Sequence, residues 1–518
     1  MASQRTVESD DGGSFSAAGE SADKVSALED RPAGSPRKGG KSPKAKKHRA
    51  SVTTGLIGGL QRQDQSMSSW VVGVLYFKSD PGFATLKKVL GDRLLSMPRF
   101  RSKMVARRFP AATHFVEIPL EELDMDYHFR QIFAERAVSE AELDGWLGSM
   151  FNEFNHPMDK PLWQMTFIPR LADGRAVLIS NVSHVIGDGI AQVEVLMRML
   201  DKPAGAGEAK AVSGNKAAAP SSAGQVKKRP PPSLGPLTRA RVFMGGIWEG
   251  LTVVATPPDR KNTVRLDDPT KPSATKRCAF SPTIDLDRLK ELKNIYQGAT
   301  INDVLITLLT LTLRAYAEEV GDKAMLKNKV TAQFPINTRS RKEGPFRNGD
   351  PHNKFSYGFM PFHIAHKGSP TKLLWKTKRA LDKIKNSPSP LVQEKISNII
   401  AKIMPLKTLN AQLTNVASKA TAQISNVPGP QSTVYMAGVP IDDMRFLLYS
   451  PLSFYIGILT YDGKLSCSVC LDSALADPAL IAKHWMTEFE KFLASAKEEA
   501  KKYPDGVIPR ERHCCDCL

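Results

Sequence analysis

The sequence predicts an α/β or α+β fold with two domains, and three observations support this prediction. Strand-like runs and amphipathic helical patterns alternate along the chain, which is typical of sheets flanked by helices. A length of 518 residues with 41% hydrophobic content is enough for two cores. A segment rich in Ala, Gly, Ser and Pro at 203–236 cannot bury a core and indicates a disordered linker. This linker separates an N-terminal domain at 53–202 from a C-terminal domain at 237–500.

Each element of the N-terminal domain is predicted from its own pattern. Strands are expected where β-branched and aromatic residues gather, and helices where apolar residues recur every three or four positions. The strand-like runs are 69–77, 161–169 and 176–184, and the helical patterns are 85–97, 140–154 and the segment after Gly189.

The C-terminal domain shows the same alternation. Thr300 is well placed as the N-cap of a long apolar helix, with Asp303 in its first turn answering the helix dipole. In chain order we expect a strand at 276–282, a helix at 286–297, the long helix from Ile301 and a strand at 329–337.

The two ends of the chain have few apolar residues that could form a core; the N-terminal end is basic and the C-terminal end is rich in cysteine. Residues 1–52 have almost no aromatic residues and are expected to form a disordered basic tail. Within them, 31–50 carries eight Lys or Arg and no acid, part of a formal net charge of +19. Such a run is a solvated tail or a contact for a polyanion. Because no nucleic-acid-binding motif accompanies it, we favour a membrane surface and expect no nucleic acid. Residues 501–518 form a Cys-rich tail whose last four residues outline a prenylation signal at Cys515.

Cysteine content and hydropathy predict the compartment. The six cysteines and a first segment without an apolar core indicate a cytosolic chain with reduced thiols. Cys467 and Cys470 lie in a strand-like run, where positions i and i+3 face opposite sides, so we expect no shared metal. No run of 18 uncharged apolar residues indicates a transmembrane helix. The segments 242–255 and 392–407 either pack on the protein or lie in a membrane interface.

The stretch NVSHVIGDG at 181–189 is the candidate for chemistry. A predicted strand reaches His184, and histidine can take a proton from a hydroxyl that attacks a carbonyl. The alternative is a structural histidine. Asp188 can fix the loop, and Gly189 permits a backbone conformation or a close approach that a side chain would forbid. Adjacent strand residues face opposite sides, so Ser183 is not expected to be a nucleophile activated by His184, and the chemistry is direct transfer.

Five motifs, in order, resemble those of the wax ester synthase/diacylglycerol acyltransferase family of the CoA-dependent acyltransferase superfamily. HVIGDG resembles the superfamily motif HxxxDG. Four further segments resemble motifs of the family: MPRFRSKMV (97–105), PLWQ (161–164), ATINDVLI (299–306) and ISNVPGP (424–430). The resemblance covers about residues 53–495. One departure is that the family usually has two histidines, and Ser183 replaces the first. We expect that Ser183→His leaves activity intact or raises it.

The resemblance implies two similar chloramphenicol-acetyltransferase-like domains, with mixed sheets flanked by helices and a substrate channel at their interface. It assigns catalysis to His184, Asp188 and Gly189, with His184 as general base. Arg101 is expected to form an ion pair with Asp188 and so to hold the loop. Five further residues are predicted to contact substrate, although cap, turn or core structure also explains several of them: Ser183, Trp163, Asn302, Ser425 and Asn426. Ser425 and Asn426 would donate to a developing oxyanion.

The implied function is an O-acyltransferase that moves a fatty acyl group from acyl-CoA to a long-chain alcohol, giving a wax ester, or to diacylglycerol, giving triacylglycerol. Acyl-CoA is a substrate, and neither a metal nor another cofactor is expected. The insoluble acceptors predict a peripheral protein at the cytoplasmic face of the endoplasmic reticulum or on lipid droplets. Two alternatives stay open: acylation of a soluble metabolite, and a lipid-binding or droplet-coating protein without catalysis.

Overall fold

The computed structural model of the chain describes residues 47–63, 68–107, 112–153, 157–202, 244–245, 248, 255–269, 271–273, 275–340, 343–387, 389–449 and 452–510. All of them belong to one compact unit, 45–518. The predicted linker at 203–236 and the predicted lipidation sequence at 515–518 lie outside the described residues, as do residues 1–46 and most of 242–255.

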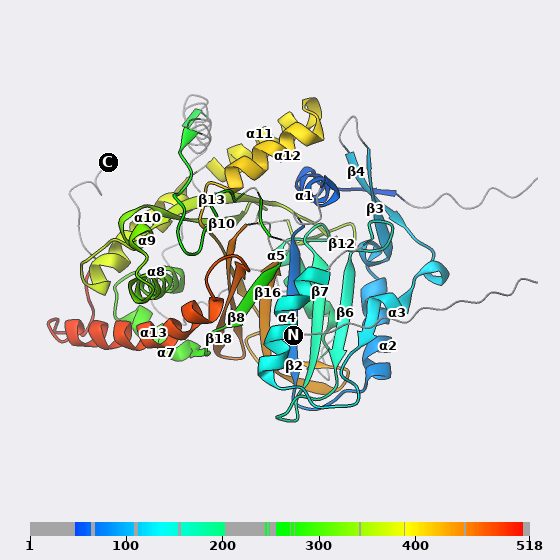
Figure 1. The fold of residues 1–518 in the computed structure, drawn as a ribbon, viewed down its shortest axis with the longest axis horizontal. Helices are drawn as coiled ribbons and strands as arrows, with labels where there is room; N and C mark the ends of the chain where they lie inside the picture. The colour runs from blue at the N-terminus through cyan, green and yellow to red at the C-terminus, as the bar shows by residue number, and fades with distance from the viewer. Residues whose placement is uncertain are drawn as a thin grey trace, which may run out of the picture. The chain divides into compact units, whose positions relative to one another are not determined.

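The first of two large sheets has six strands in the order β15-β16-β2-β7-β6-β5 (Figure 1). In that order the strands are Tyr435–Met436, Val439–Tyr449, Trp70–Phe77, Ala176–Ser183, Trp163–Ile168 and Phe129–Gln131. Alternation along β2 divides its side chains between two cores. Leu75 and Phe77 pack with α2 (Phe83–Leu95) and α5 (Gly189–Met199), whereas Val72 and Val74 pack with α4 (Glu140–Glu153).

The second sheet has seven strands in the order β13-β10-β14-β17-β18-β8, with β9 paired to β18. In that order they are Phe355–Phe362, Val330–Asn337, Ala422–Pro428, Phe454–Tyr461, Lys464–Asp472, Lys276–Phe280 and Ile284–Asp285. β14 runs parallel to both β10 and β17 while the other pairs are antiparallel, so the predicted mixed sheet is confirmed. The helices of this half include α7 (Leu286–Asn294), α8 (Ile301–Glu319), α10 (Pro370–Asn386) and α13 (Pro478–Ala500).

The two faces of the second sheet differ in what covers them. Ile424 and Ile456 belong to the core that also contains α8 and α13. Tyr455 and Cys470 belong to the core of the first sheet, so this face is turned toward the first sheet. Cys467 lies in the helix-covered core, which confirms that Cys467 and Cys470 face opposite sides of their strand.

The sheets do not follow the predicted domain boundary. The eight residue pairs between β16 and β2 place 441–449, from the C-terminal half of the sequence, inside the first sheet. The predicted strands and helices are present at their expected places, for example β2 at Trp70–Phe77 and α8 from Ile301. Alternating hydrophobicity predicts that a strand exists and which face is buried, but not which sheet it joins.

A small third sheet corrects the predicted end of the N-terminal tail. Its strands are β1 (Lys47–Arg49), β4 (Ala112–Glu117) and β3 (Ser102–Arg107), with β4 in the middle. His48 Nε2 lies 2.8 Å from Glu117 Oε1, and helix α1 (Val52–Gln63) follows directly. Residues 47–52 are therefore part of the fold because β4 supplies backbone partners and an acid for a segment that looks like solvated basic tail.

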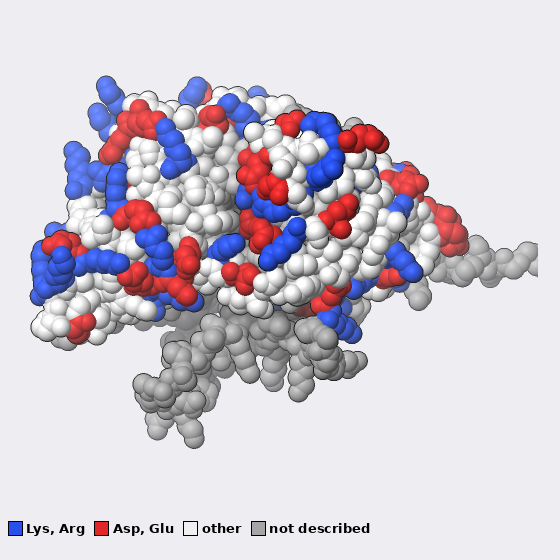
Figure 2. Space-filling model, turned by 90° about the horizontal axis from the view of Figure 1, so that it is seen from below, with Lys and Arg blue, Asp and Glu red and all other residues white. Residues whose placement is uncertain are grey.

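The remaining described elements are short or peripheral. They are η2 (Pro98–Arg101), η3 (Leu120–Glu122), α3 (Met125–His128), α9 (Lys323–Lys327), β11 (Phe346–Arg347), β12 (Asp350–Pro351), α11 (Ser389–Ile403) and α12 (Leu406–Ala417). None of the helices within the described ranges is long and apolar enough to cross a membrane. Acidic and basic side chains are intermixed on the face shown in Figure 2, which presents no surface of a single sign.

Candidate active site

His184 follows the last residue of β7, where the chain leaves the first sheet. Its main-chain N–H donates to Ser69 O at 2.8 Å, and its ring lies edge-on to the Phe355 ring with centroids 5.5 Å apart. Its pKa is lowered from 6.5, mainly by burial, although Asp188 acts in the opposite direction. The side chain nevertheless keeps accessible surface. With its pKa lowered, this imidazole is neutral at pH 7, the form that accepts a proton.

Asp188 holds the loop that follows His184 through three contacts. Its Oδ2 lies 2.8 Å from Arg339 Nη2 and accepts the Lys354 N–H at 2.8 Å. Its Oδ1 accepts the Ala191 N–H at 3.2 Å as the N-cap of α5. The Arg339 and Asp188 side chains are 2% and 7% exposed, so a buried ion pair ties this loop to the C-terminal half of the chain.

The predicted ion pair between Arg101 and Asp188 is wrong. Arg101 Nη2 binds Glu117 Oε2 at 3.0 Å, and its Nη1 donates to Leu95 O at 2.6 Å. The strand register is the reason, because β3 and β4 pair Ser102 with Glu117 and so place the acid beside Arg101. The same segment does reach the loop through Arg99, whose Nη1 donates to Ile186 O at 2.8 Å.

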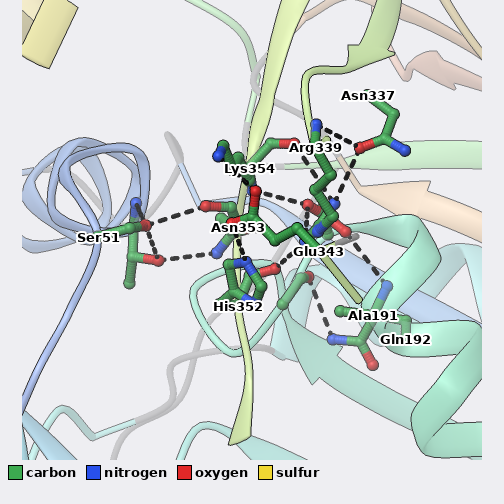
Figure 3. Close-up of polar contacts among 12 residues, drawn as sticks. Ser51, Ala191, Gln192, Asn337, Arg339, Glu343, His352, Asn353 and Lys354 are labelled. Atoms are coloured by element: carbon green, nitrogen blue, oxygen red, sulfur yellow. Dashed lines mark hydrogen bonds and ion pairs between the residues drawn. The ribbon is translucent and has the colours of Figure 1, made fainter. Parts of the chain in front are cut away.

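Asn353 fastens the main chain of the histidine loop from the other half (Figure 3). Its Nδ2 lies 2.9 Å from His184 O and 3.2 Å from Val185 O, and 3.0 Å from Thr54 Oγ1 of α1. Its own carbonyl accepts the Ser51 hydroxyl at 3.1 Å. One amide side chain therefore joins the histidine loop, helix α1 and the start of β13.

A charged network supports these contacts from behind. Figure 3 shows Arg339, Glu343, His352 and Lys354 gathered beside the loop. Lys354 Nζ binds Glu343 Oε2 at 2.6 Å, and Arg339 also donates to the carbonyls of His352 and Lys354. These carbonyl acceptors hold the guanidinium of Arg339 in the position where it pairs with the Asp188 carboxylate.

Ser183 is fully buried beneath the loop and does not face a substrate. Its hydroxyl donates to Gln61 Oε1 at 3.1 Å and accepts the Val185 N–H at 3.3 Å. The predicted substrate contact at Ser183 is therefore wrong. Because α1 closes over this position, a histidine in place of Ser183 would have to displace Gln61, which argues against the expectation that Ser183→His leaves activity intact.

Within the histidine loop, the glycine that has no room for a side chain is Gly187, and the special conformation or close approach predicted for Gly189 is wrong. The backbone of Gly189 does not have a positive φ angle. A Cβ added there would lie 3.6 Å from Val427 Cγ2, which is an ordinary van der Waals contact. At Gly187 a Cβ would lie 2.9 Å from Ala191 Cβ and 3.1 Å from Pro351 Cβ. Gly189 instead marks where α5 comes close to β14.

The start of α8 and the end of β14 meet, which joins two of the predicted motifs. Asn426 Nδ2 donates to Asn302 Oδ1 at 2.7 Å. The predicted N-cap is confirmed, because Thr300 and Asp303 form a reciprocal capping box. Asp303 is fully buried and lies 3.4 Å from Lys378 Nζ, so its role is structural.

Strand alternation separates the roles of Ser425 and Asn426. Asn426 faces α8, whereas Ser425 lies on the same side of β14 as Val427, which approaches Gly189. Ser425 is therefore the residue of the pair that looks toward the histidine loop. Gly429 ends the motif as a required glycine, because a Cβ there would lie 2.5 Å from Thr460 O.

Trp163 is a core anchor, and the predicted substrate contact is wrong. The side chain has no exposed surface. Its Nε1 donates to Phe100 O at 2.7 Å, and its ring stacks on His128 with centroids 4.3 Å apart. It therefore sets the position of η2, which carries Arg99, and touches the loop only through that segment.

Two residues that hold the site, Arg339 and Asn353, were missed by sequence reasoning. A usable signal was present: the polar runs NTR at 337–339 and DPHNK at 350–354 lie at the end of β10 and the start of β13. Polar residues at strand ends are the same signal that singled out His184. Within the described ranges, no group of three or more His, Cys, Asp or Glu could hold a metal ion.

The fold is that of a known class of acyl-transfer and condensation proteins. A wax ester synthase/diacylglycerol acyltransferase from Marinobacter aquaeolei VT8 superposes with a TM-score of 0.57 at 17% identity, over 88% of this chain and 100% of that one. The first condensation domain of the calcium-dependent antibiotic synthetase also gives 0.57, at 14% identity over 87% and 97%. The predicted fold class is confirmed.

Sequence comparison identifies the family within that class. Residues 76–305 match the wax ester synthase/diacylglycerol acyltransferase catalytic domain, and 352–492 match the WS/DGAT C-terminal domain. A putative diacylglycerol O-acyltransferase of Mycobacterium tuberculosis is 26% identical over 351 residues, 64% of this chain and 67% of that protein. Wax ester synthase/diacylglycerol acyltransferase 9 of Arabidopsis thaliana is 26% identical over 357 residues, 62% and 71% respectively. This chain belongs to the wax ester synthase/diacylglycerol acyltransferase family and is an acyl-CoA-dependent O-acyltransferase of that type.

Proposed function

We propose that His184 is the general base in the transfer of a fatty acyl group from acyl-CoA to a long-chain alcohol or to diacylglycerol. The hydroxyl proton passes to His184 as the hydroxyl oxygen attacks the thioester carbon. The tetrahedral intermediate then expels the CoA sulfur, which takes the proton back from the imidazolium. The products are an oxygen ester and CoA, and no covalent acyl-enzyme forms.

The observation that carries this proposal is a half-buried histidine at a strand end, whose lowered pKa keeps it neutral at pH 7. Its Nδ1 is buried, which leaves Nε2 to meet the hydroxyl. The main-chain carbonyl of His184 acts to raise the ring pKa, and Asn353 binds that same carbonyl. A base held in this way can contribute about 10² to 10⁴ in rate.

We propose Ser425 as a donor to the oxyanion that develops on the thioester carbonyl. It lies on the side of β14 that faces Gly189, whereas Asn426 is engaged with Asn302. Oxyanion donors stabilise the transition state more than the ground state, so their loss lowers kcat. Asn426 and Asn302 would then act by fixing the end of β14.

The decisive experiment compares wild type, His184→Ala and the control His366→Ala. Each protein is incubated with palmitoyl-CoA and either hexadecanol or dioleoylglycerol, while CoA release and neutral lipid are measured. We expect kcat of His184→Ala to be lower than that of wild type by a factor of about 10² to 10⁴, and kcat of the control to be unchanged. A His184→Ala protein with more than about a third of wild-type kcat would refute the general-base assignment, since a positioned base is worth at least about 10².

We also propose a peripheral membrane contact through α11, because the acceptors are insoluble. Leu391 and Ile399 are 52% and 59% exposed, with the exposed Lys395 between them. The helix packs along β13, whose first residue Phe355 touches His184, and Gln393 hydrogen bonds Ser356 (Figure 1). Such a helix would place an apolar face in the lipid beside the site.

The membrane proposal is tested by co-sedimentation with vesicles that contain anionic lipid. Leu391→Gln with Ile399→Gln should release most of the protein, while Leu120→Gln, at a position 57% exposed on η3, should not. Equal binding of both proteins would contradict a contact through α11. Residence at the endoplasmic reticulum or on lipid droplets, and lipidation of Cys515, remain proposals; an unmodified C-terminal peptide from membrane-bound protein would exclude the lipid.

A further inference from the structure

Strand β8 is held to its neighbour β18 by two side-chain pairs in succession. In their antiparallel register Lys276 lies opposite Asp472, and Cys278 lies opposite Cys470. Lys276 Nζ binds Asp472 Oδ2 at 3.0 Å, and the two side chains are 2% and 0% exposed. Residues two apart on a strand face the same side, so the cysteine pair follows this buried ion pair along one face of the two strands.

The two thiols of the cysteine pair are already in contact. Cys278 Sγ and Cys470 Sγ lie 3.2 Å apart, and a disulfide bond brings two sulfurs to about 2.05 Å. Residues directly opposite in an antiparallel pair have Cα atoms about 4.5–5.5 Å apart, which is within the range of about 4.4–6.8 Å found across disulfides. Closing the bond therefore needs rotation about side-chain bonds but no movement of the strands.

The cysteine pair lies where the two halves of the fold meet. Cys470 is 4% exposed and belongs to the core of the first sheet, and Cys278 packs against that core while keeping accessible surface. Helix α4 runs against the backbone of β8, because a Cβ on Gly148 would lie 3.6 Å from Lys276 O and 3.9 Å from Cys278 N. A small oxidant can therefore reach Cys278 from solvent, with Cys470 enclosed behind it.

The surroundings of Cys278 set how readily it reacts. Burial and the neighbouring Cys470 raise the pKa of the Cys278 thiol well above its usual value, whereas Lys276 acts to lower it. Because the thiolate is the nucleophile, this thiol reacts slowly at neutral pH and does not suit covalent catalysis. A slow thiol with a second thiol in contact suits a bond that forms under sustained oxidation.

We propose that Cys278 and Cys470 form a redox-active pair that closes to a disulfide under oxidising conditions. With hydrogen peroxide as the oxidant, the Cys278 thiolate attacks one peroxide oxygen, expels hydroxide and becomes a sulfenic acid. The Cys470 sulfur then attacks the Cys278 sulfur, which forms the S–S bond and expels the sulfenic oxygen as water. In sum, two thiols and one peroxide give one disulfide and two water molecules, because the expelled hydroxide takes up the proton that Cys278 had lost.

The disulfide would fasten β8, which stands at the end of its sheet next to β18. An edge strand has a backbone partner on one side only, and segments with few partners open locally before the rest of a fold. Cys278 and Cys470 are 192 positions apart in the sequence, and a cross-link that closes a long loop restricts the unfolded chain most. The oxidised protein should therefore unfold at a higher temperature than the reduced protein, whether or not His184 is the general base.

The test compares wild type with Cys278→Ser and the control Cys467→Ser. Cys467 lies on the same strand as Cys470 but in the helix-covered core, so the control removes a buried thiol without changing the pair. Each full-length protein is treated with hydrogen peroxide, alkylated, digested and analysed by mass spectrometry without reduction. We expect a peptide that links Cys278 to Cys470 in wild type and in the control, its loss after dithiothreitol, and its absence from Cys278→Ser.

Melting temperatures give the second readout. Peroxide should raise the melting temperature of wild type and of the control by several degrees, and dithiothreitol should reverse the rise, whereas Cys278→Ser should show no shift. The reduced proteins show which variants are folded, and the wild-type peptides alone decide the linkage.

Three results would overturn the proposal. One is wild type in which Cys278 and Cys470 can both still be alkylated after peroxide. Another is a bond from Cys278 to Cys514, Cys515 or Cys517 in place of Cys470. The third is an equal rise in melting temperature in Cys278→Ser, because the stabilisation would then come from elsewhere in the chain.

Discussion

Replacing Arg339 with methionine tests whether the buried ion pair with Asp188 holds the histidine loop. Methionine keeps much of the length of the side chain but removes its charge and its donors. Asp188 then loses its 2.8 Å partner and keeps the N–H groups of Lys354 and Ala191. Removing one member of a buried pair costs about 3–5 kcal/mol, because the other charge stays buried and unpaired. Because the two N–H donors to Asp188 remain, we expect the loss in the free energy of unfolding to be at the lower end of this range, about 3 kcal/mol.

The matched control is Arg101→Met, the arginine that the sequence wrongly assigned to this pair. Its partner is Glu117, and the two side chains are 24% and 16% exposed, so we expect a loss of about 1 kcal/mol or less. Urea unfolding followed by circular dichroism measures both changes, and single-turnover assays measure the chemical step. Misplacement of the loop by about 1 Å would lower the rate of Arg339→Met about 10²-fold. A larger loss in Arg101→Met than in Arg339→Met, in stability or rate, would refute the assignment.

Three further predictions concern the same loop. Activity should fall as pH drops through the lowered pKa of His184, because the proposed base can accept a proton only as the neutral imidazole; a pH–rate profile with its midpoint above 6.5 would contradict this. Asn353→Leu removes the donor to the carbonyls of residues 184 and 185 and should lower kcat more than KM, whereas equal kcat in the variant would show that the contact does not position the base. Gly187→Ala should lower the melting temperature by several degrees and Gly189→Ala by little, and the reverse order would contradict the packing described for the loop.

Local sequence patterns predicted much of the secondary structure, but not which residues and strands that are distant in the sequence contact one another. The strand ending at His184, the capping box of Thr300 and the opposite faces of Cys467 and Cys470 all follow from periodicity and spacing, which act over a few residues. The ion pair of Asp188 does not, because its partner lies about 150 residues further along, and the strand register, which local spacing does not specify, directs Arg101 to Glu117. The place of β16 in the first sheet was missed for the same reason.

The histidine loop belongs to the first half by sequence but is held largely by the second. Arg339 and Lys354 bind Asp188, Asn353 binds the carbonyl of His184, and Phe355 contacts its ring. These four residues come from the end of β10 and the start of β13. A shift between the two sheets would therefore change the position of the proposed base. The buried contacts at this corner of the second sheet thus all bear on the position of one histidine, so the variants at Arg339 and Asn353 test the same function by different contacts.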